Sequence, residues 1–388
     1  MTGTATEKAN NISVCALVPY PPDTTPSQRF RIEQWIPHLA AQGISVDIFP
    51  FADDAMLRQM PQPGRRVAKA AANIRRFVAR FSDVAAARNY DVILIHRAAC
   101  IIGPAILERF LAMAGLPIIY DFDDAIFVLH TTEANRRFAW LKFPGKTASI
   151  CRMSSHVVVG NSWLADYARQ HNSNVSVIPT SIDTRSYRRA NGRRANGRVI
   201  VGWTGSSTSQ TYLEGFAPVL KELVSRRDVE IRVISNREPL LPGIPYQWRS
   251  WSPETEVEEL SKFDIGIMPM PDEEWARGKC ALKALQYMAS GIPTICSSIG
   301  ANREVIQHGE NGLLAGTPDE WLSQLENLID NADLRSSLGS AGRKTVEDRY
   351  SMHSSAELFA QVVRSVTSGD RSVVTCRTSG VSIPESNK

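Results

Sequence analysis

The sequence predicts an α/β protein built from two parallel, helix-covered sheets. Short apolar runs alternate with helical patterns along most of the chain, as in sheets whose strands are joined by crossover helices. The chain has 388 residues, more than a single hydrophobic core usually organises. A basic segment without apolar periodicity contains the pentapeptide RRANG twice, at Arg188–Gly192 and Arg193–Gly197, and is typical of a linker. Two Rossmann-like halves around a linker are therefore expected.

The first half begins with an apolar strand, Ile12–Val18, broken by the proline-rich Pro19–Pro22. A helix is predicted over Phe30–Ala41 and stopped by Gly43. Helical patterns fill most of the gaps between the later strands, which favours a parallel sheet. These further strands are predicted at Ile44–Phe49, Val92–Ile95, Pro117–Tyr120, His156–Val159 and Val175–Ile178.

After the linker the alternation of strands and helices restarts. Strands are predicted at Val199–Trp203, Glu230–Ile234, Asp264–Met268 and Pro293–Cys296. Closing helices are predicted at Glu320–Leu328, Leu334–Val346 and Ser355–Val366. The expected organisation is a first domain at 1–187, a basic linker at 188–198, a second domain at 199–350, a final helix at 351–366 and a disordered tail at 367–388.

The stretch 275–302 holds the densest group of candidate functional residues. A helix predicted over Gly278–Ala289 would place Lys279, Lys283 and Gln286 on one stripe, apart from its apolar face. Cations near a helix N-terminus add to the dipole and the backbone N–H groups that already attract phosphate. A phosphate site is favoured over the alternative, a solvated helix face.

A loop of small residues that includes Gly205 and Ser206 joins a predicted strand to a predicted helix. Its backbone N–H groups could approach an anion, and its hydroxyls could cap the helix behind them. The loop has neither G-x-G-x-x-G nor Walker A spacing. A simple helix cap is therefore an equal interpretation.

Three carboxylates, Asp121, Asp123 and Asp124, follow a strand in the segment YDFDDAIF. They lie at the carboxyl end of the strand, where open α/β sheets bind ligands. The favoured interpretation is action on an acceptor hydroxyl or on a developing positive charge. A helix N-cap ranks second and a site for a hard metal ion third.

Three further residues are expected at the same edge of the first sheet. His96 ends a strand, where it could titrate or bind a ligand, or serve as a hydrogen-bonded structural residue. Arg29 and Arg31 follow the loop after the first strand. They could neutralise a phosphate or simply line the surface of their helix.

The segment 64–87 is predicted to be a basic amphipathic helix. Its basic residues Arg65, Arg66, Lys69, Arg75, Arg76 and Arg80 interleave with the apolar residues Val67, Ala71, Ile74, Val78 and Phe81. Such a helix could lie on an anionic membrane. The favoured interpretation is that its apolar stripe packs on its own domain.

The composition narrows the function classes. The formal net charge of +4 is too small to indicate nucleic-acid binding. The N-terminus is polar without a secretory apolar region, and no apolar run approaches the ~18 residues of a membrane span. The six cysteines are scattered without a C-x-x-C pair, which is typical of reduced core residues in the cytosol. A cytoplasmic protein is expected, with peripheral contact at the inner face of the membrane as an option.

Together these residues resemble the group 1, family 4-like glycosyltransferases of the GT-B fold, of the bacterial envelope-polysaccharide type. The segment Asp264–Ala315 is similar to the donor-binding region of that family, and Val157–Asp183 resembles its segment leading to the interdomain crossover. The resemblance implies an acceptor domain followed by a nucleotide-sugar domain, facing each other across a cleft. It also implies that the last helix crosses back to the first domain, and that transfer retains configuration without a metal or other cofactor.

Two glutamates usually frame the donor helix in that family, and here Gly278 and Gln286 stand in their places. Gln286 could still bind a ribose hydroxyl, and Asp272, Glu273 or Glu274 in the preceding loop could replace the first glutamate. The resemblance also places Gly300 and Asn302 in the donor region.

The expected function is transfer of a sugar from a nucleotide-diphosphate sugar to a glycan or lipid-linked acceptor. Lys279 and Lys283 would compensate the charge of the departing diphosphate, with the acceptor near Asp121, Asp123 and His96. A nucleotide-sugar epimerase and a catalytically degenerate two-domain binding protein are the alternatives.

Overall fold

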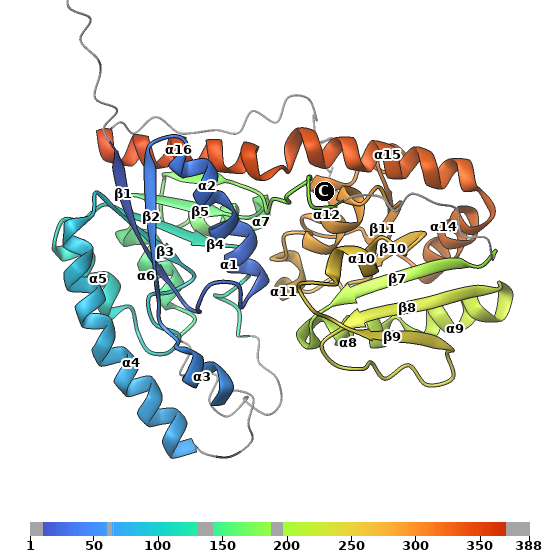
Figure 1. Cartoon of the computed structure of the whole chain (residues 1–388), viewed down its shortest axis with the longest axis horizontal. Helices are drawn as coiled ribbons and strands as arrows, with labels where there is room; N and C mark the ends of the chain where they lie inside the picture. Colours follow the sequence, from blue (N-terminus) through green and yellow to red (C-terminus); the bar gives the residue numbers. More distant parts are fainter. Residues whose placement is uncertain (1–10, 60–63, 65, 130–142, 188–196, 370–388) are drawn as a thin grey trace, which may run out of the picture.

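The computed structural model describes residues 11–59, 64, 66–129, 143–187 and 197–369. Two six-stranded parallel sheets lie side by side, each covered by helices (Figure 1). This arrangement confirms the predicted α/β class with two Rossmann-like halves. The predicted linker and tail fall mostly on residues outside the described ranges, so the domain boundaries stay a prediction.

The first sheet has the strand order β2-β1-β3-β4-β5-β6, with every neighbouring pair parallel. Its strands are β1 (Ile12–Val18), β2 (Ile44–Pro50), β3 (Val92–His96), β4 (Ile118–Phe122), β5 (His156–Val159) and β6 (Val175–Val177). All six were predicted within two residues at each end. Buried parallel strands are continuous apolar runs, and the sequence makes such runs easy to find.

The second sheet has the order β12-β11-β10-β7-β8-β9 and is also parallel. Its strands are β7 (Val199–Gly205), β8 (Val229–Ser235), β9 (Tyr246–Ser250), β10 (Ile265–Met268), β11 (Thr294–Ser297) and β12 (Leu313–Ala315). The two edge strands, β9 and β12, were not predicted. The first is largely polar and half exposed, and the second has three residues, so neither gives a clear apolar run.

The first half contains α1 (Pro26–Arg31), α2 (Ile36–Ala40), α3 (Asp54–Gln59), α4 (Arg66–Ala86), α5 (Ile106–Met113), α6 (Lys146–Met153) and α7 (Ser162–Arg169). The single helix predicted over Phe30–Ala41 is wrong. The chain leaves the helical conformation at Ile32, where φ is −133°, and a 3₁₀ turn at Glu33–Trp35 separates α1 from α2. Pro37 then lies in the first turn of α2, where its missing N–H group costs no hydrogen bond.

The second half contains α8 (Ser207–Gly215), α9 (Ala217–Arg226), α10 (Glu256–Leu260), α11 (Glu274–Arg277), α12 (Leu282–Ala289), α13 (Asn302–Val305), α14 (Pro318–Asp330), α15 (Ala332–Arg349) and α16 (Met352–Ser368). The helix predicted over Gly278–Ala289 begins at Leu282, four residues later than expected. The residue before it, Ala281, has a left-handed φ of 54°, so 278–281 is a loop. Lys279 and Lys283 therefore do not share a helical stripe.

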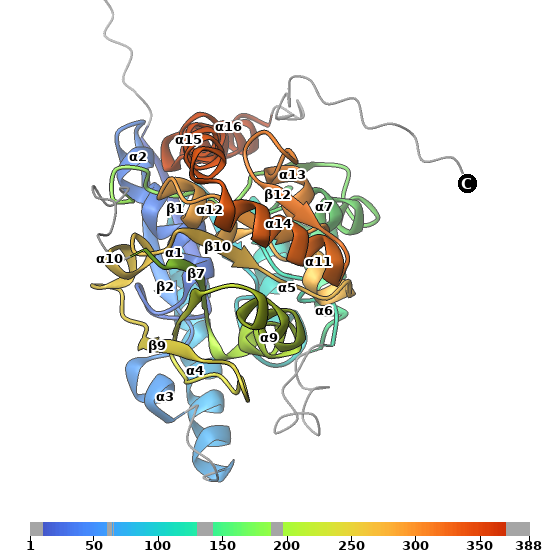
Figure 2. The same cartoon turned by 90° about the vertical axis from the view of Figure 1, so that its right-hand side faces the viewer.

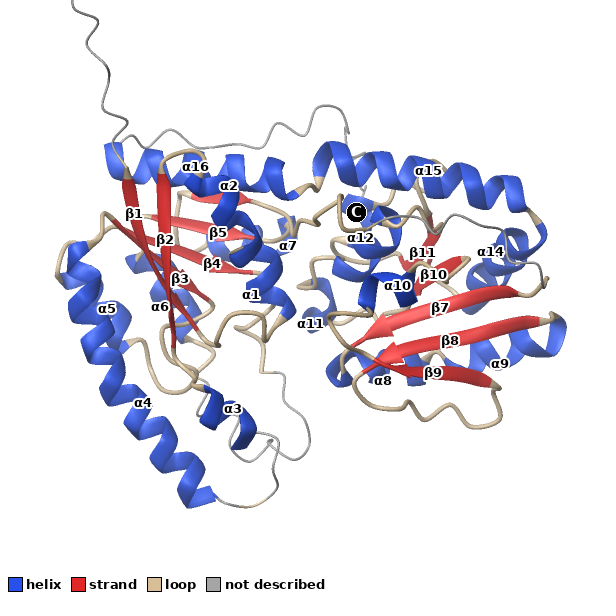
Figure 3. Ribbon diagram, in the orientation of Figure 1, coloured by secondary structure: helices blue, strands red, loops and turns tan. Residues whose placement is uncertain are grey.

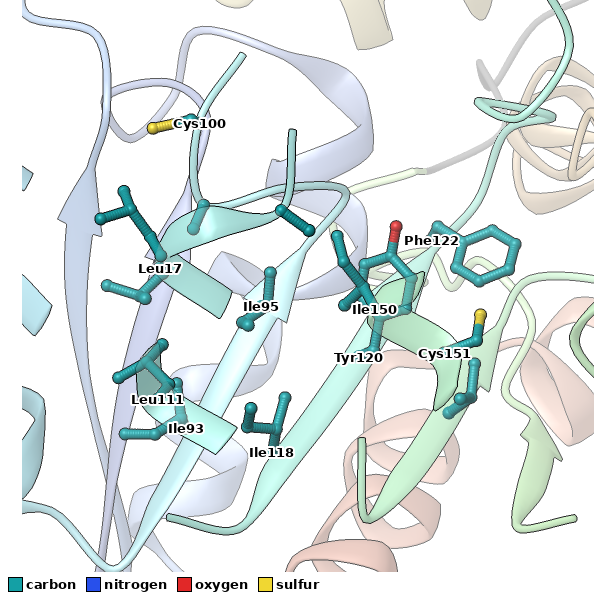
Figure 4. Close-up of a cluster of buried hydrophobic side chains, with 14 of the residues drawn as sticks. Leu17, Ile93, Ile95, Cys100, Leu111, Ile118, Tyr120, Phe122, Ile150 and Cys151 are labelled. Atoms are coloured by element: carbon teal, nitrogen blue, oxygen red, sulfur yellow. The ribbon is translucent and has the colours of Figure 1, made fainter. Parts of the chain in front are cut away.

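A hydrophobic core lies on one face of the first sheet, between its strands and helices α5, α6 and α7. Figure 4 shows Ile93 and Ile95 of β3 and Tyr120 of β4 among the buried side chains. Leu111 and Ile150, from α5 and α6, close this core. Packing on this face fixes the positions at which β3 and β4 end.

Helix α16 returns the chain to the first sheet and covers its other face (Figure 3). Phe359 is buried there, with its ring centroid 5.5 Å from that of Trp35. Just before α16, Ser351 forms a parallel bridge with Ile182, which leads out of the first half. The backbone N–H of Ile182 donates to the carbonyl of Tyr350 at 2.8 Å, so the two crossing segments are hydrogen-bonded to each other.

Within the described ranges, no helix has both the length and the apolar character needed to cross a bilayer. The five cysteines that the structure describes are free, and four of them are buried.

Candidate functional site

The site begins at the carboxyl ends of β3 and β4, where the last residue of β3, His96, lies beside Asp121 of β4. The parallel register carries both side chains to the same edge of the sheet. Asp121, Asp123, Asp124 and His96 are all buried there. The structure thus brings together the four residues predicted to be catalytic.

Asp121 is held in a buried ionic network. It accepts hydrogen bonds from Nε of Arg31 at 3.1 and 3.2 Å, and from Nδ1 of His96 at 2.7 Å. Burial opposes its ionisation, but Arg31 and His96 outweigh that effect and lower the pKa of Asp121 below its usual value. Asp121 is therefore a fixed carboxylate that orients its neighbours.

Asp123 and Asp124 follow Asp121 closely in the chain, and both are bound by Arg97. The guanidinium of Arg97 donates to Oδ1 of Asp123 at 3.0 and 2.8 Å, and also to Asp124. Ser27 donates to the same Oδ1 of Asp123 at 2.6 Å. Burial opposes ionisation, but Arg97, His96 and Arg31 hold the pKa of Asp123 well below its usual range.

Lys279 connects this cluster to the second half of the chain. Its ammonium group lies 2.7 Å from Oδ1 of Asp124 and 4.8 Å from the ring centroid of Trp275. The side-chain amide of Asn161 donates to the carbonyl of Lys279 at 3.0 Å. The loop that carries Lys279 is thus docked against the end of the first sheet.

Two glycines allow this docking. A Cβ atom on Gly160 would lie 2.2 Å from Sγ of Cys280, and one on Gly278 would lie 2.7 Å from the backbone nitrogen of Ala125. The thiol of Cys280 also donates to the carbonyl of Asp123 at 3.1 Å. Tertiary contact with the first half therefore explains why α12 begins later than its sequence pattern predicts.

Lys283 lies in the first turn of α12, with its ammonium group 5.6 Å from the ring centroid of Trp203. Burial, with a further contribution from Lys279, lowers the pKa of Lys283 to about 8. No hydrogen bond or ion pair joins it to any other residue that the structure describes. A partly buried ammonium without an anionic partner favours a bound anion.

Gly205 and Ser206 precede α8. A Cβ on Gly205 would lie 2.5 Å from the Trp203 ring, so the chain approaches the indole closely. Neither Ser206 before α8 nor Ala281 before α12 caps its helix with a side chain. The helix-cap interpretation of Ser206 is therefore wrong: the N–H of Ser207 at the start of α8 donates to Oδ1 of Asn236 at 2.8 Å. Helix α12 leaves N-terminal N–H groups for another acceptor.

Gln286 and Asn302 are not part of this cluster. Gln286 is 4% exposed and donates to Tyr187 at 3.0 Å and to Glu256 at 3.1 Å in a separate buried network. Asn302 is 1% exposed and donates to the carbonyl of Ser297. Both amide nitrogens bind protein groups away from solvent, and the donor-binding role of the two residues stays a prediction.

The two arginines proposed for phosphate binding are also engaged by the protein. Arg31 is fully buried on Asp121 and the carbonyl of Ile178, which makes its phosphate role wrong. Arg29 reaches Glu256 of α10 at 3.1 Å, which gives a second ion pair between the halves. Glu274 is exposed at the start of α11, and Gly300 packs against the backbone of Arg277.

Two other interpretations of the aspartates can be judged. In the described residues up to 129, no helix follows Asp124, so the N-cap interpretation is wrong there. No group of three or more His, Cys, Asp or Glu side chains among the described residues is placed to hold a metal ion. Arg97 and Lys279 already bind the carboxylates that would have been its ligands.

Sequence reasoning missed several partners in the site: Ser27, Arg97, Asn161 and Cys280. Arg97 follows His96 directly and has a left-handed φ of 60°, which turns its side chain back onto Asp123. Its position after a strand was visible in the sequence, but its backbone conformation was not.

Comparison with known proteins identifies the class. Residues 199–331 match the family of group 1 glycosyl transferases. The chain is 24% identical over 311 residues to the MMP α-(1→4)-mannosyltransferase of Mycolicibacterium hassiacum, covering 72% of each chain. It is 27% identical over 116 residues to a D-inositol 3-phosphate glycosyltransferase of Corynebacterium urealyticum, covering 29% of this chain and 26% of that one.

Solved structures share the whole fold. Sucrose-phosphate synthase from Thermosynechococcus elongatus superposes with a TM-score of 0.69 at 14% identity, over 92% of this chain and 100% of that one. HepE of Anabaena in complex with UDP-glucose superposes with a TM-score of 0.62 at 16% identity, over 91% and 100%. The fold is therefore GT-B. Residues 199–331 resemble the group 1 glycosyl transferases, and nothing in these comparisons supports the epimerase alternative.

Proposed function

We propose that this glycosyltransferase moves a sugar from a nucleotide-diphosphate sugar to a glycan or lipid-linked acceptor, with retention of configuration and without a metal ion. The observation that carries the proposal is Lys283, a partly buried ammonium without an anionic partner among the described residues. It lies in the first turn of α12, whose N-terminus has no side-chain cap, and near the ring of Trp203. These groups suit a diphosphate.

The chemistry requires compensation of the negative charge that develops on the departing diphosphate. Lys283 and the N-terminus of α12 would supply it, and Lys279 would add to it on release from Asp124. Fixed donors in a site shielded from water stabilise such charge strongly. HepE of Anabaena, which shares this fold, forms a complex with UDP-glucose, and this supports a nucleotide sugar as donor.

The acceptor side would be formed by Asp123, Asp124 and His96. Asp123 is a poor proton acceptor, because its neighbours hold its pKa well below its usual range. We therefore assign it an electrostatic role, favouring the positive charge that develops on the sugar. The first half, proposed at residues 1–187, would be the acceptor domain, with peripheral membrane contact through 64–87.

The test is a thermal-shift series with UDP, GDP, ADP and their sugars in EDTA, run on the wild type and on Lys283→Gln. One nucleotide series should raise the melting temperature of the wild type, and the variant should lose most of that shift and of its turnover. Lys344→Gln is the matched control, since Lys344 is exposed and pairs only with Asp348 along its helix.

Equal shifts in the two lysine variants would remove Lys283 from the donor site. Shifts that require Mn²⁺ would contradict metal independence. Binding without turnover on any acceptor would indicate the catalytically degenerate alternative.

A further inference from the structure

Helix α4 turns Arg76 and Arg80 toward the protein, where Phe77 and Val84 also pack on the first-half core, and it leaves a second apolar stripe in solvent. Arg76 donates to the carbonyls of Pro50 and Phe51, and Arg80 to those of Val18, Phe49 and Ala99. The outward stripe consists of Val67, Ile74, Val78 and Phe81, which are 85%, 66%, 63% and 41% exposed. The stripe named from the sequence is therefore exposed, contrary to the favoured interpretation, and α4 packs on its own domain through Phe77 and Val84 instead.

The inward stripe has a clear structural purpose. Carbonyl groups at the ends of β1 and β2 have no further strand to bind, and the two guanidinium groups satisfy them. The outward stripe has no such purpose within the described residues. Exposed apolar side chains at a spacing of seven, four and three residues form one continuous face.

Helix α5 continues this face. It packs beside α4, with the ring centroids of Phe81 and Phe110 6.1 Å apart. Of the ten exposed large apolar side chains among the described residues, seven belong to these two helices: Val67, Ile74, Val78, Phe81, Ile106, Phe110 and Met113. A pocket of about 580 Å³ opens beside α5 and is lined by Ile106, Phe110, Met113 and Phe143, with Arg109 at its wall.

The charge of α4 indicates what covers this face. The helix carries five basic residues and one acidic residue, a net charge of +4. Arg76 binds only neutral carbonyls in the hydrogen bonds that the structure shows, so its charge is not cancelled. A symmetric pair of copies joined through this face would bring two such helices together and be repelled. An anionic lipid surface suits both the apolar stripe and the charge.

We propose that α4 and α5 form a membrane-docking face that inserts its apolar side chains into an anionic bilayer. This rests on the peripheral contact proposed above and specifies it: the apolar stripe is the part that enters the lipid. Arg76 and Arg80 stay on the protein, and the basic charge of the helix supplies long-range attraction. Figures 1 and 2 show α4 projecting from the first half, which leaves its outer face accessible.

The experiment is co-sedimentation of the full chain with vesicles of phosphatidylcholine and phosphatidylglycerol, at low and at high ionic strength. Hydrophobic insertion predicts binding that weakens only modestly in high salt, because screening acts on charges and not on apolar burial. The variant Ile74→Asp/Val78→Asp should lower the partition coefficient at least about tenfold. Leu240→Asp is the matched control: Leu240 is 75% exposed in the second half, and its variant should bind like the wild type.

Three results would overturn the proposal: no binding of the wild type to anionic vesicles, equal binding of the α4 variant, or binding abolished by salt. Binding abolished by salt would assign the membrane contact to the basic residues alone. A dimer in light scattering that the α4 variant dissolves would assign the face to a second copy. The donor-induced thermal shift, measured on the same samples, reports separately on the proposed transferase function.

Discussion

Arg31 and Asp121 form an ion pair that solvent does not reach, and this explains how a carboxylate can remain charged inside the first half. Hydrogen bonds from Nε and Nη2 of Arg31 and from Nδ1 of His96 replace the lost hydration of Asp121. Removing one partner of such a pair leaves an unpaired buried charge. The pair is therefore a positioning device, and the arginine is not available for a phosphate.

Arg31→Met should destabilise the fold by about 3–5 kcal/mol, measured by urea unfolding. The exposed Arg169, paired with Asp166, gives the control Arg169→Met, which should change stability by less than about 1 kcal/mol. Because the folded pKa of Asp121 is lowered, its contribution is present above the usual carboxyl pKa and is lost as the pH falls. Equal stability of the two variants would contradict this.

Lys283 predicts a pH dependence of donor binding. Without ligand its pKa is about 8, and a bound diphosphate would raise it by favouring the charged form. Affinity should therefore be constant below about pH 7 and weaken above about pH 8, as measured by calorimetric titration. Lys283→Arg remains charged throughout and should remove this dependence if it binds. If the Lys283→Arg variant keeps the same pH dependence of donor affinity, Lys283 is not the source of that dependence.

At the scale of elements, the sequence predicted what local patterns determine. Buried strands such as β1 and β5 were predicted with their observed ends, because their apolar runs stop at turn residues. The start of α12 and the orientation of α4 were not predictable, since each depends on contacts distant in the chain. The clustering of His96 with the aspartates followed from parallel strands ending at one edge, while their arginine partners required side-chain geometry.

The docked loop before α12 predicts coupling between two small residues. Gly160→Ala places a methyl group 2.2 Å from Sγ of Cys280, so the variant should lose about 1–3 kcal/mol of stability. Cys280→Ala removes that sulfur and should restore part of the loss in the double variant, measured as a thermal double-mutant cycle. Purely additive effects would show that the two residues do not meet.

At the scale of the whole molecule, helix α16 connects the last part of the chain to the first sheet. Phe359 is 1% exposed and packs on Trp35, so this helix belongs to the first half in its packing although it follows the second half in sequence. Packing of this kind makes the stability of the first half depend on residues more than three hundred positions away.

Phe359→Ala should therefore destabilise the first half by about 3–5 kcal/mol, through lost burial and a cavity against Trp35. Differential scanning calorimetry should show a lower melting temperature for the unfolding transition of the first half. Phe110→Ala is the control, because Phe110 is 48% exposed and its loss should cost less than about 1 kcal/mol. A Phe359 variant as stable as the control would mean that α16 is only loosely attached.

The hydrogen-bonded bridge between Ile182 and Ser351 has a mechanical consequence. The chain passes between the halves twice, and the bridge holds both passages together on one side of the molecule. Two adjacent connections permit rotation of one half relative to the other about the line that joins them. They restrict twisting and sliding of the halves. Swinging apart would break the Asp124–Lys279 and Arg29–Glu256 pairs together. One rotation would thus free Lys279 for the donor and carry the aspartates away from it.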